Sequence, residues 1–393
     1  MEKSRRIEIL QENLAGGDLQ GAIITYSRNL LYYTGTAQPA WLFVTPGDYA
    51  LFVRSGYEFA AREAFIEGKR VREERKPGKN AATFFPAVKG AGGGRVGVEK
   101  DIWTWEQSGE LGEILPGREF VNISGMTLTQ RKRKDAGEIS ALRKACDVIH
   151  AGHEAVLDTL REGVTELELA GAVENAHRLA GHEGIFFIRL PDFFMSRGPI
   201  SSGPNLFRPS GVVYTSTGVG LSPAVPAGPS RRSVAGGDTV VVDIPVLVEG
   251  YHADQTRTYV LGRASGGTRA LYDDLKRIAD HLVETIRPGT PAGEVSRLAF
   301  QKARELGREE PFQHFGKGKR SPIVGHGIGL ELNEPPILSG HDASEIPEDC
   351  VVALDMHMMD GEAGVVKLED MIRIGKGGNE ILTKSPRDLF EVP

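Results

Sequence analysis

The amino-acid sequence predicts an α/β (α+β) protein of two domains, and three observations support this fold class. The chain has 393 residues, which is more than one typical domain holds and enough for about two. Short runs of β-branched and aromatic residues alternate with longer segments of helical periodicity. The second part of the chain also repeats a helical segment at an offset of 126 positions, from Arg161 to Arg287. We therefore expect domains at 1–125 and 126–393, the second built from duplicated halves.

The first domain is predicted from alternating helices and strands. A turn signal, Pro46-Gly47-Asp48, separates two apolar runs and is typical of a hairpin. No catalytic constellation of residues is evident in this domain. The expected elements are helices at 5–15 and 56–68 and strands at 21–26, 41–44, 49–53 and 95–99.

The second domain opens on a basic run and continues with helices. The run 131–134 is predicted to be the solvated start of a helix, and apolar residues at helical spacing continue to residue 160. The segment from Arg161 to Gly181 then shares its start and stop signals with the segment from Arg287 to Gly307. Two unrelated helices with common start signals are the alternative explanation. A duplication would place a pseudo-two-fold axis through any site between the halves.

The stretch 237–258 is predicted to carry two aspartates of a functional site. A short β-branched run ends at Asp243, Gly250 breaks the next strand, and Asp254 follows. An ionised carboxylate within an apolar strand is costly unless it is paired or bound to a metal ion. Taken alone, the pattern also fits a turn with two surface aspartates.

Three further candidates for the same site come from the last 70 or so residues, roughly the length of a small domain. His326 stands between two glycines, and strand alternation puts Asp355 and His357 on one face and Lys367 and Glu369 on one face of the next strand. Four carboxylates and a neutral imidazole suit one or two divalent ions such as Mn²⁺, Fe²⁺, Co²⁺ or Zn²⁺. Without metal the carboxylates would repel one another and some would take up protons. Separate surface turns are the alternative to the predicted ligand set of Asp243, Asp254, His326, Asp355 and Glu369.

Several stretches together resemble the pita-bread metallohydrolases, a family that includes prolidase, aminopeptidase P, methionine aminopeptidase and creatinase. The first region resembles the N-terminal domain of prolidases, aminopeptidases P and creatinase. The resemblance implies an N-terminal creatinase/prolidase-type domain and a C-terminal pita-bread catalytic domain. It also implies that Asp243, Asp254, His326 and Glu369 are four of five metal ligands, whereas Asp355 stands where the family has a glutamate. The matching stretches are GDTVVVDIPVLVEGYHADQTRT, RKRKDAGEISALRKA, IRPGTPAGEV, VGHGIGLELNEPP, VVKLED and ILTKSPRDL.

Two histidines of the family pattern are absent from this sequence. Asn333 occupies the position seven residues after His326, and the stretch 217–228 before the first ligand strand has no titratable side chain. Asn333 can donate a hydrogen bond to a carbonyl or oxyanion but cannot carry a proton. We therefore consider Glu334 as a possible proton acceptor and His357 as a replacement for a missing histidine. His252 shares a strand face with Asp254 and is a candidate for substrate binding, with a role behind the site or at the surface as the alternative.

The resemblance implies a metal-dependent hydrolase of the Xaa-Pro dipeptidase or aminopeptidase type, which cleaves an amide bond next to proline with a metal-activated water. Two alternatives remain open: an enzyme that cleaves a C–N or related bond of a non-peptide on the creatinase fold, and a catalytically silent binding protein. The expected partner is a small molecule or a short peptide, and we expect a homodimer.

Composition bears on the binding partners and the cellular compartment of the protein. The net charge of −6 gives no indication of nucleic-acid binding, and no long apolar run predicts a membrane span or a signal peptide. The two cysteines, Cys146 and Cys350, are too few for a disulfide framework and fit a reducing compartment. A cytoplasmic location is the expectation.

Overall fold

The structure is a computed structural model that describes all residues except 1, 2, 4, 87–93, 191–197, 212–214, 217 and 317. The described chain divides into two compact units, Met1–Arg131 and Lys132–Pro393. The division lies a few residues after the predicted boundary at 125/126. Each unit is mixed α/β, as predicted.

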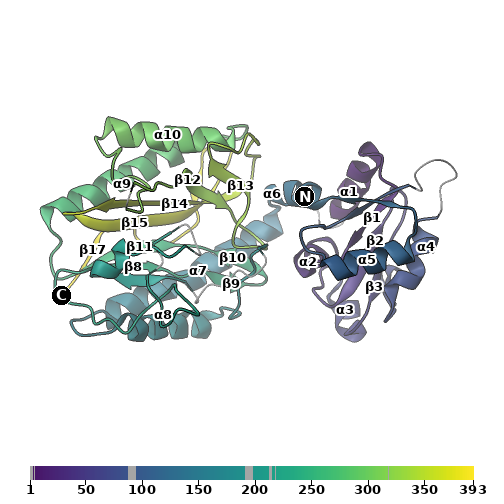
Figure 1. Ribbon diagram of the computed structural model, residues 1–393, viewed down its shortest axis with the longest axis horizontal. Coiled ribbons are helices and arrows are strands. Elements are labelled where there is room, and N and C mark those ends of the chain that lie inside the picture. The colour runs from purple at the N-terminus through teal and green to yellow at the C-terminus, as the bar shows by residue number, and fades with distance from the viewer. Residues whose placement is uncertain are drawn as a thin grey trace. The chain divides into compact units, whose positions relative to one another are not determined.

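The first unit is built on a mixed sheet in the strand order β4-β3-β2-β1-β5-β6 (Figure 1). The predicted hairpin is confirmed, because β2 and β3 pair antiparallel from Ala40↔Val53 to Val44↔Tyr49. The predicted helix 56–68 is shorter in the structure and ends at Glu63, since the Phe65 N–H turns to the Thr34 carbonyl at 2.9 Å. The elements are α1 (Arg5–Gly16), β1 (Gly21–Ile24), α2 (Ser27–Thr34), β2 (Ala40–Val44), β3 (Tyr49–Val53), α3 (Tyr57–Glu63), β4 (Val71–Glu73), α4 (Ala81–Phe84), β5 (Arg95–Val98), α5 (Trp105–Ile114), β6 (Glu119–Asn122) and α6 (Ser124–Lys132), with 3₁₀ turns at Gly68–Arg70 and Pro77–Asn80.

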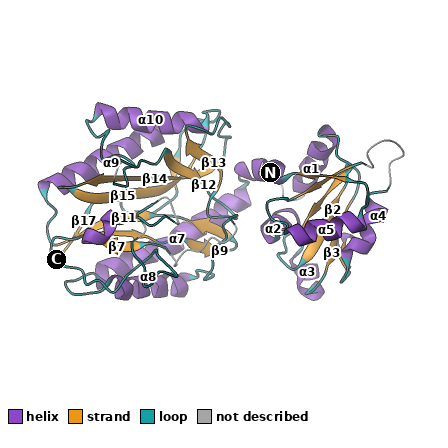
Figure 2. Cartoon of the chain, viewed as in Figure 1, coloured by secondary structure: helices purple, strands orange, loops and turns teal. Residues whose placement is uncertain are grey.

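The second unit is built on a long sheet in the strand order β13-β12-β14-β15-β11-β8-β7. Figure 1 shows α9 and α10 along the β14–β15 half and α7 and α8 along the β8–β11 half, and Figure 2 shows the strands between these helix pairs. The elements are α7 (Ala136–Thr159), α8 (Glu166–Ala180), β7 (Ile200–Ser202), β8 (Thr239–Asp243), β9 (Val246–Val248), β10 (Tyr251–Ala253), β11 (Thr256–Leu261), α9 (Gly266–Thr285), α10 (Ala292–Glu305), β12 (Ile323–Gly327), β13 (Glu334–Ser339), β14 (Val351–Asp360), β15 (Gly364–Arg373), β16 (Glu380–Ile381) and β17 (Phe390–Val392), with a 3₁₀ turn at Gly203–Phe207.

The repeated segments adopt the same local structure. Helices α8 and α10 begin at Glu166 and Ala292, which are again 126 positions apart. Each is preceded by a glycine of positive φ, Gly163 and Gly289, whose N–H bonds a distant carbonyl, of Val234 and Ile346 respectively. Because the sheet order runs β14-β15 on one side of its centre and β11-β8 on the other, the two halves meet at the β15–β11 pair. This arrangement agrees with the predicted duplication.

The basic run is not solvated, which corrects the prediction for residues 131–134. Only Arg133 is exposed, whereas the other three side chains are buried. Each of these cations has a polar partner within its own unit: Arg131 donates to Asn29 Oδ1 at 2.9 Å, and Lys132 donates to Ser344 Oγ at 2.7 Å. Lys134 pairs with a buried glutamate described below. These charges can be buried because each has a polar partner that is far away in the sequence. The pattern of charges along the sequence does not reveal such partners.

Candidate metal centre

The pairing register places the predicted acidic residues in a row across four adjacent strands. Asp243 of β8 lies opposite Thr256 of β11, and Thr256 lies opposite Glu369 of β15. Glu369 in turn lies opposite Asp355 of β14. Residues directly opposite one another on neighbouring strands point to the same face of a sheet. The strands therefore collect side chains from both halves of the unit on one face.

Strand alternation explains why this face is polar although it is buried. In β14 and β15 the apolar even-numbered residues pack against α9 and α10, among them Val352, Leu354, Val366 and Leu368. The odd-numbered residues point to the opposite face. Burial of the apolar side chains against the helices stabilises the strands. The carboxylates on the opposite face of the sheet are thereby held together.

Three of the five predicted ligands converge on a single point. Ligand atoms of Asp254, His326 and Glu369 all lie within 4.8 Å of one another, and all three residues are buried. Nδ1 of His326 lies 3.0 Å from the Gly327 carbonyl and donates its proton there, so Nε2 keeps its lone pair. Oε1 of Glu369 is buried without a hydrogen-bond partner among the described residues, 3.9 Å from His326 Nε2. This donor set fits a divalent ion that accepts nitrogen and oxygen ligands.

The other two predicted ligands share a buried lysine. Nζ of Lys367 donates a short hydrogen bond to Asp243 Oδ2 and lies 3.0 Å from Asp355 Oδ1. It also lies 3.9 Å from Glu369 Oε2, and its side chain is 1% exposed. Neither Lys367 nor Thr256 is predicted from the sequence as a site residue. The alternation that places Lys367 beside Glu369 is the signal that indicates it.

Burial and mutual repulsion shift the pKa values of these groups. Burial raises the pKa of Asp254 well above its usual range, and the neighbouring Asp243 raises it further. The pKa of Glu369 is raised in the same way, by burial and then by Asp254. Burial lowers the pKa of His326, which keeps its ring neutral. Burial alone would lower the pKa of Lys367, but the carboxylates around it outweigh this effect and raise it. The cluster therefore favours cations.

A buried arginine supports the strand that carries Glu369. Arg257 is 1% exposed and donates from Nη2 to Asp370 Oδ1 at 2.7 Å and from Nη1 to the Glu369 carbonyl at 2.7 Å. It also bonds the carbonyls of Ser385 and Pro386 at 2.8 Å each, which ties the chain after β16 to β11 and β15. Arg257 thus has a structural role.

The two candidate histidines outside the ligand set both contact the backbone. In His252, Nδ1 lies 3.0 Å from the Gly329 carbonyl and Nε2 accepts from the Phe187 N–H at 3.0 Å, so both ring nitrogens are engaged. His357 shares a strand with Asp355, and its Nε2 lies 3.0 Å from the His314 carbonyl. Burial lowers the pKa of His357 to about 4. Both rings are therefore neutral anchors of the surrounding loops.

The remaining two candidates differ in exposure. The side chain of Asn333 is exposed. Glu334 is 2% exposed and forms a buried ion pair with Lys134 at the start of β13. The ion pair holds the Glu334 carboxylate in place against Lys134.

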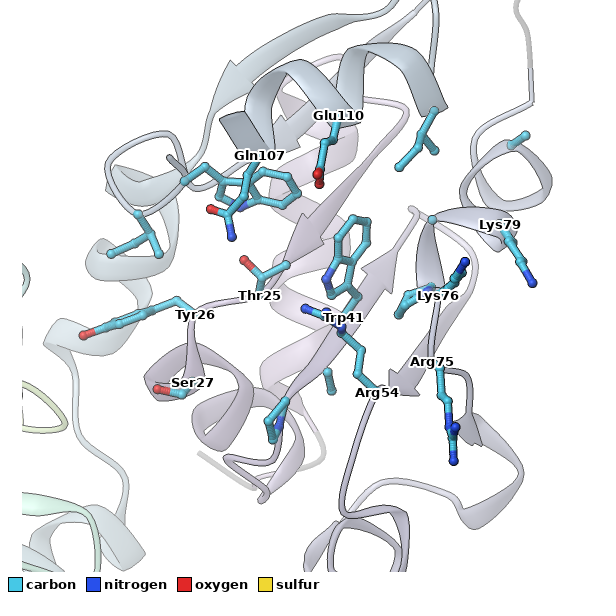
Figure 3. Close-up of a pocket in the computed structure, with 18 residues that line it drawn as sticks. Thr25, Tyr26, Ser27, Trp41, Arg54, Arg75, Lys76, Lys79, Gln107 and Glu110 are labelled. Carbon is cyan, nitrogen blue, oxygen red and sulfur yellow. The ribbon is translucent and has the colours of Figure 1, made fainter. Parts of the chain in front are cut away.

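The first unit has its own cavity, of about 970 Å³. Figure 3 shows Trp41 beside it together with the cations Arg54, Arg75 and Lys76, and Glu110 on the opposite wall. Glu110 is the one carboxylate among the described lining residues, and no histidine or cysteine lines the cavity. The described lining residues lack the donor set of a metal centre.

Both units of the chain match models of known protein families. The model of "Metallopeptidase family M24" matches residues 140–376, and that of the "Creatinase/Prolidase N-terminal domain" matches residues 6–133. Relatives named Xaa-Pro dipeptidase match along nearly the whole chain. The one from Pyrococcus horikoshii is 26% identical over 393 residues and 99% of each chain, and the one from Pyrococcus furiosus is 26% identical over 98% of this chain and 99% of its own.

Solved structures show the same fold. The prolidase from Pyrococcus horikoshii superposes with a TM-score of 0.80 at 25% identity, over 99% of this chain and 100% of that one. A Xaa-Pro dipeptidase from Bacillus anthracis gives a TM-score of 0.82 at 24% identity, over 99% of both chains. Every helix in the described part of the chain is too short or too polar to cross a membrane.

Proposed function

We propose, from the premise that this chain belongs to metallopeptidase family M24, that it hydrolyses Xaa-Pro dipeptides with a bound divalent ion. The observation that carries the proposal is the convergence of buried Asp254, His326 and Glu369, whose ligand atoms all lie within 4.8 Å of one another. Relatives named Xaa-Pro dipeptidase that match along the full length support the substrate class. The predicted set of Asp243, Asp254, His326, Asp355 and Glu369 remains the proposed ligand field, and Mn, Co, Fe or Zn the proposed ion.

The residues of the chain prepare this site for the ion. Such an ion polarises a substrate carbonyl and lowers the pKa of a water. Thr256 Oγ1 donates to Glu369 Oε2 at 2.9 Å and leaves Oε1 directed at His326. The Nδ1 contact of His326 fixes the ring orientation and tautomer. These contacts hold the donor atoms in place before the ion binds.

Proton transfer is the weak step of the proposed reaction. Asn333 can donate a hydrogen bond to a substrate carbonyl, but it cannot accept a proton. Glu334 is tied to Lys134, and His357 is tied to the His314 carbonyl. A positioned general acid or base contributes about 10²–10⁴-fold to a rate. We therefore expect slow cleavage of Xaa-Pro dipeptides.

The test is kcat/KM on Xaa-Pro dipeptides and longer peptides, with Mn²⁺, Co²⁺ and Zn²⁺ each supplied to the full chain. We expect measurable dipeptide cleavage with kcat/KM below about 10⁴ M⁻¹s⁻¹, the lower end of the ordinary enzyme range. His326→Ala is the control, because activity that survives it does not arise at this site. A value above that range would show that another group replaces the missing histidines, and His357 would be mutated first.

The same measurement separates the alternatives. Metal binding without peptide cleavage, but with turnover of a small amide or guanidino compound, would indicate a non-peptide enzyme on this fold. Metal binding without any turnover would indicate a binding protein. A homodimer and a cytoplasmic location remain part of the proposal. Light scattering on the purified chain tests the former, and both cysteines being free and buried supports a reducing compartment.

A further inference from the structure

The cavity of the first unit lies at one edge of its sheet. Strands β1, β3, β4 and β5 run parallel to one another, because β1 and β3 both pair antiparallel with β2, and β4 and β5 pair parallel with β3 and β1. Thr25, Arg54 and Arg75 follow β1, β3 and β4 in the chain and line the cavity, and so does Trp103 after β5. In open α/β sheets, ligands bind outside the carboxyl ends of the strands. All described lining residues belong to Met1–Arg131, so the cavity is a feature of this one unit.

The lining of the cavity is cationic, although the chain as a whole has a net charge of −6. Four cations and one carboxylate, Glu110, give the described lining residues a formal charge of +3. A cleft lined by one sign of charge attracts and concentrates ions of the opposite sign. The cavity therefore favours an anionic ligand. The four cations are Arg54, Arg75, Lys76 and Lys79.

These four cations differ from other cations at the surface of the same unit. Lys69 pairs with Glu67 at 2.9 Å, whereas no carboxylate among the described residues forms an ion pair with any of the four. Figure 3 shows the Arg54 side chain pointing into the cavity beside Trp41, while Arg75 points away from that ring. A guanidinium binds phosphate or carboxylate oxygens through two parallel hydrogen bonds. Arg54 is therefore the best-placed group to hold an anion.

Two indole rings form the wall of the cavity next to Arg54. The ring centroids of Trp41 and Trp103 lie 5.5 Å apart in an edge contact, and Trp41 also packs on Phe43 at 6.0 Å between centroids. Trp41 is half-buried, so part of its ring faces the cavity while these contacts fix its orientation. Aromatic side chains bind the planar rings of ligands by stacking. The cavity thus offers a stacking surface beside a site for an anion.

The size of the cavity and its hydrogen-bonding groups define the ligand further. Its volume of about 970 Å³ is at the upper end of the roughly 300–1,000 Å³ that is typical of small-molecule sites. Glu110 of α5 is an acceptor for an amino group, on the wall opposite the cations. Oε1 of Gln107 accepts the Thr104 N–H at 2.9 Å, which leaves the amide N–H groups of Gln107 as donors. A ligand with an anionic group, a planar ring and an amino group on that ring matches these features.

We propose that this cavity binds a nucleoside monophosphate whose base carries an amino group. The base stacks on Trp41, the phosphate binds Arg54 and Lys76, and the amino group of the base donates to Glu110. The site is separate from the proposed metal centre, because all of the proposed metal ligands lie in Lys132–Pro393. The proposal gives the first unit a binding function of its own, which does not depend on peptidase activity.

The first experiment titrates the full chain with small ligands by isothermal titration calorimetry. The probes are AMP, GMP, CMP and UMP, together with adenosine and inorganic phosphate. We expect one equivalent of at least one of AMP, GMP and CMP to bind about 10-fold or more tightly than UMP, adenosine and phosphate. UMP has no amino group on its base, and adenosine and phosphate each lack part of the contacts. Binding of none of the first three, or binding that any other probe equals, would overturn the proposal.

Substitutions in the cavity should weaken the binding of the tightest nucleotide. Arg54→Gln removes the cation and should raise Kd by about 10-fold or more. Arg62→Gln is the matched control and should leave Kd unchanged, because Arg62 is an exposed arginine of the same unit outside the cavity lining. Arg54 is exposed as well, so neither substitution should prevent folding. An unchanged Kd in Arg54→Gln would overturn the proposal.

The stacking contact is tested by two substitutions of Trp41. Trp41→Leu removes the ring and should raise Kd by about 5-fold or more. Trp41→Phe keeps an aromatic ring and should bind the nucleotide more tightly than Trp41→Leu does. Equal Kd values in the wild type and in a folded Trp41→Leu protein would contradict the proposed pose of the base.

A variant of the second unit tests where the nucleotide binds. Phosphate groups also bind divalent ions, so binding at the cavity has to be distinguished from binding at the proposed metal centre. His326→Ala removes a proposed metal ligand and should bind the nucleotide with the Kd of the wild type. Loss of nucleotide binding in this variant would place the ligand in the second unit and overturn the proposal.

Discussion

At the scale of single residues, Asp355 combines two properties that bear on each other. Its side chain is one methylene shorter than the glutamate implied by the family resemblance, and its carboxylate lies 3.0 Å from Nζ of Lys367. A shorter arm leaves room for the ammonium, which provides the positive charge that the carboxylate needs. Substitution of Asp355 therefore tests whether its carboxylate serves the lysine or the metal ion.

Asp355→Glu should tighten the binding of divalent metal. The longer side chain extends the carboxylate of this proposed ligand further past Lys367 and into the site. We expect Kd for Mn²⁺ to fall by up to about 10-fold, the lower range of effects in residues around a metal ion. Isothermal titration calorimetry measures this, with Asp360→Glu at the end of the same strand as the control. Weaker binding in Asp355→Glu would mean that the pocket is closed around the shorter side chain.

Residue patterns predicted the faces of the strands but not their alignment. Alternation alone places Asp355 with His357 and Lys367 with Glu369. The register Asp355↔Glu369, which brings the lysine between two aspartates, depends on the hairpin turn and on packing against α9. A one-residue slip would reverse every side chain. Alternation places Lys367 on the same face as Glu369, but its position between two aspartates follows only from three-dimensional pairing.

At the scale of elements, the contact between α7 and α8 depends on a buried histidine. His177 of α8 is 2% exposed, and its Nε2 lies 3.2 Å from the Ile149 carbonyl of α7. A Cβ added to Gly152 would lie 2.1 Å from the same nitrogen, so only glycine fits beneath the ring. Burial lowers the pKa of His177 to about 4. The helix pair therefore requires a neutral imidazole.

This histidine should make the stability of the second unit sensitive to acid. The unfolded chain binds a proton near the ordinary pKa of about 6.5, whereas the folded chain does so only near 4. The unfolded state therefore binds more protons between these values, and stability is lost as the pH falls through this window. Between pH 7.5 and pH 5, His177 should account for about 2 kcal/mol of lost stability.

Urea unfolding of the wild type and of His177→Gln at both pH values measures this contribution. We expect the variant to be less stable at pH 7.5 but to lose less stability on acidification. An equal loss in both proteins would show that other groups, such as His153, carry the acid sensitivity. Burial lowers the pKa of His153 to about 4 as well.

The starts and ends of the helices were predicted better than the burial of their charged side chains. The capping residues of α7 and α8, Asp135 and Thr165, and the glycine Gly181 after α8 are local signals that sequence alone carries. Burial of Arg131, Lys132 and Lys134 depends on distant partners and was predicted wrongly. Local chemistry determines where a helix starts, and tertiary contacts determine which of its charges meet water.

At the scale of the whole molecule, metal binding should affect one unit and not the other. All proposed ligands lie in Lys132–Pro393. Ion at 100 times its Kd stabilises the protein that binds it by about 2.7 kcal/mol, which slows exchange through unfolding about 100-fold. Hydrogen exchange with and without Mn²⁺ should therefore show added protection in β8, β11, β12, β14 and β15. The strands of Met1–Arg131 should exchange at unchanged rates.

His326→Ala provides the control for this measurement. The variant should show the metal-free exchange pattern whether or not Mn²⁺ is present. Equal protection of both units in the wild type would mean that the ion binds elsewhere or that the units unfold together.

The sequence positions of the triad have a topological consequence. Asp254 belongs to the first half of the second unit, whereas His326 and Glu369 belong to the second, and α9 and α10 lie between them in the chain. An ion held by all three is a reversible cross-link that closes a long loop across the duplication. Closing a loop of this length restricts the unfolded chain far more than it restricts the folded one. A duplicated fold that places its donors on both copies thereby makes each copy dependent on the other, because neither half alone has all three donors.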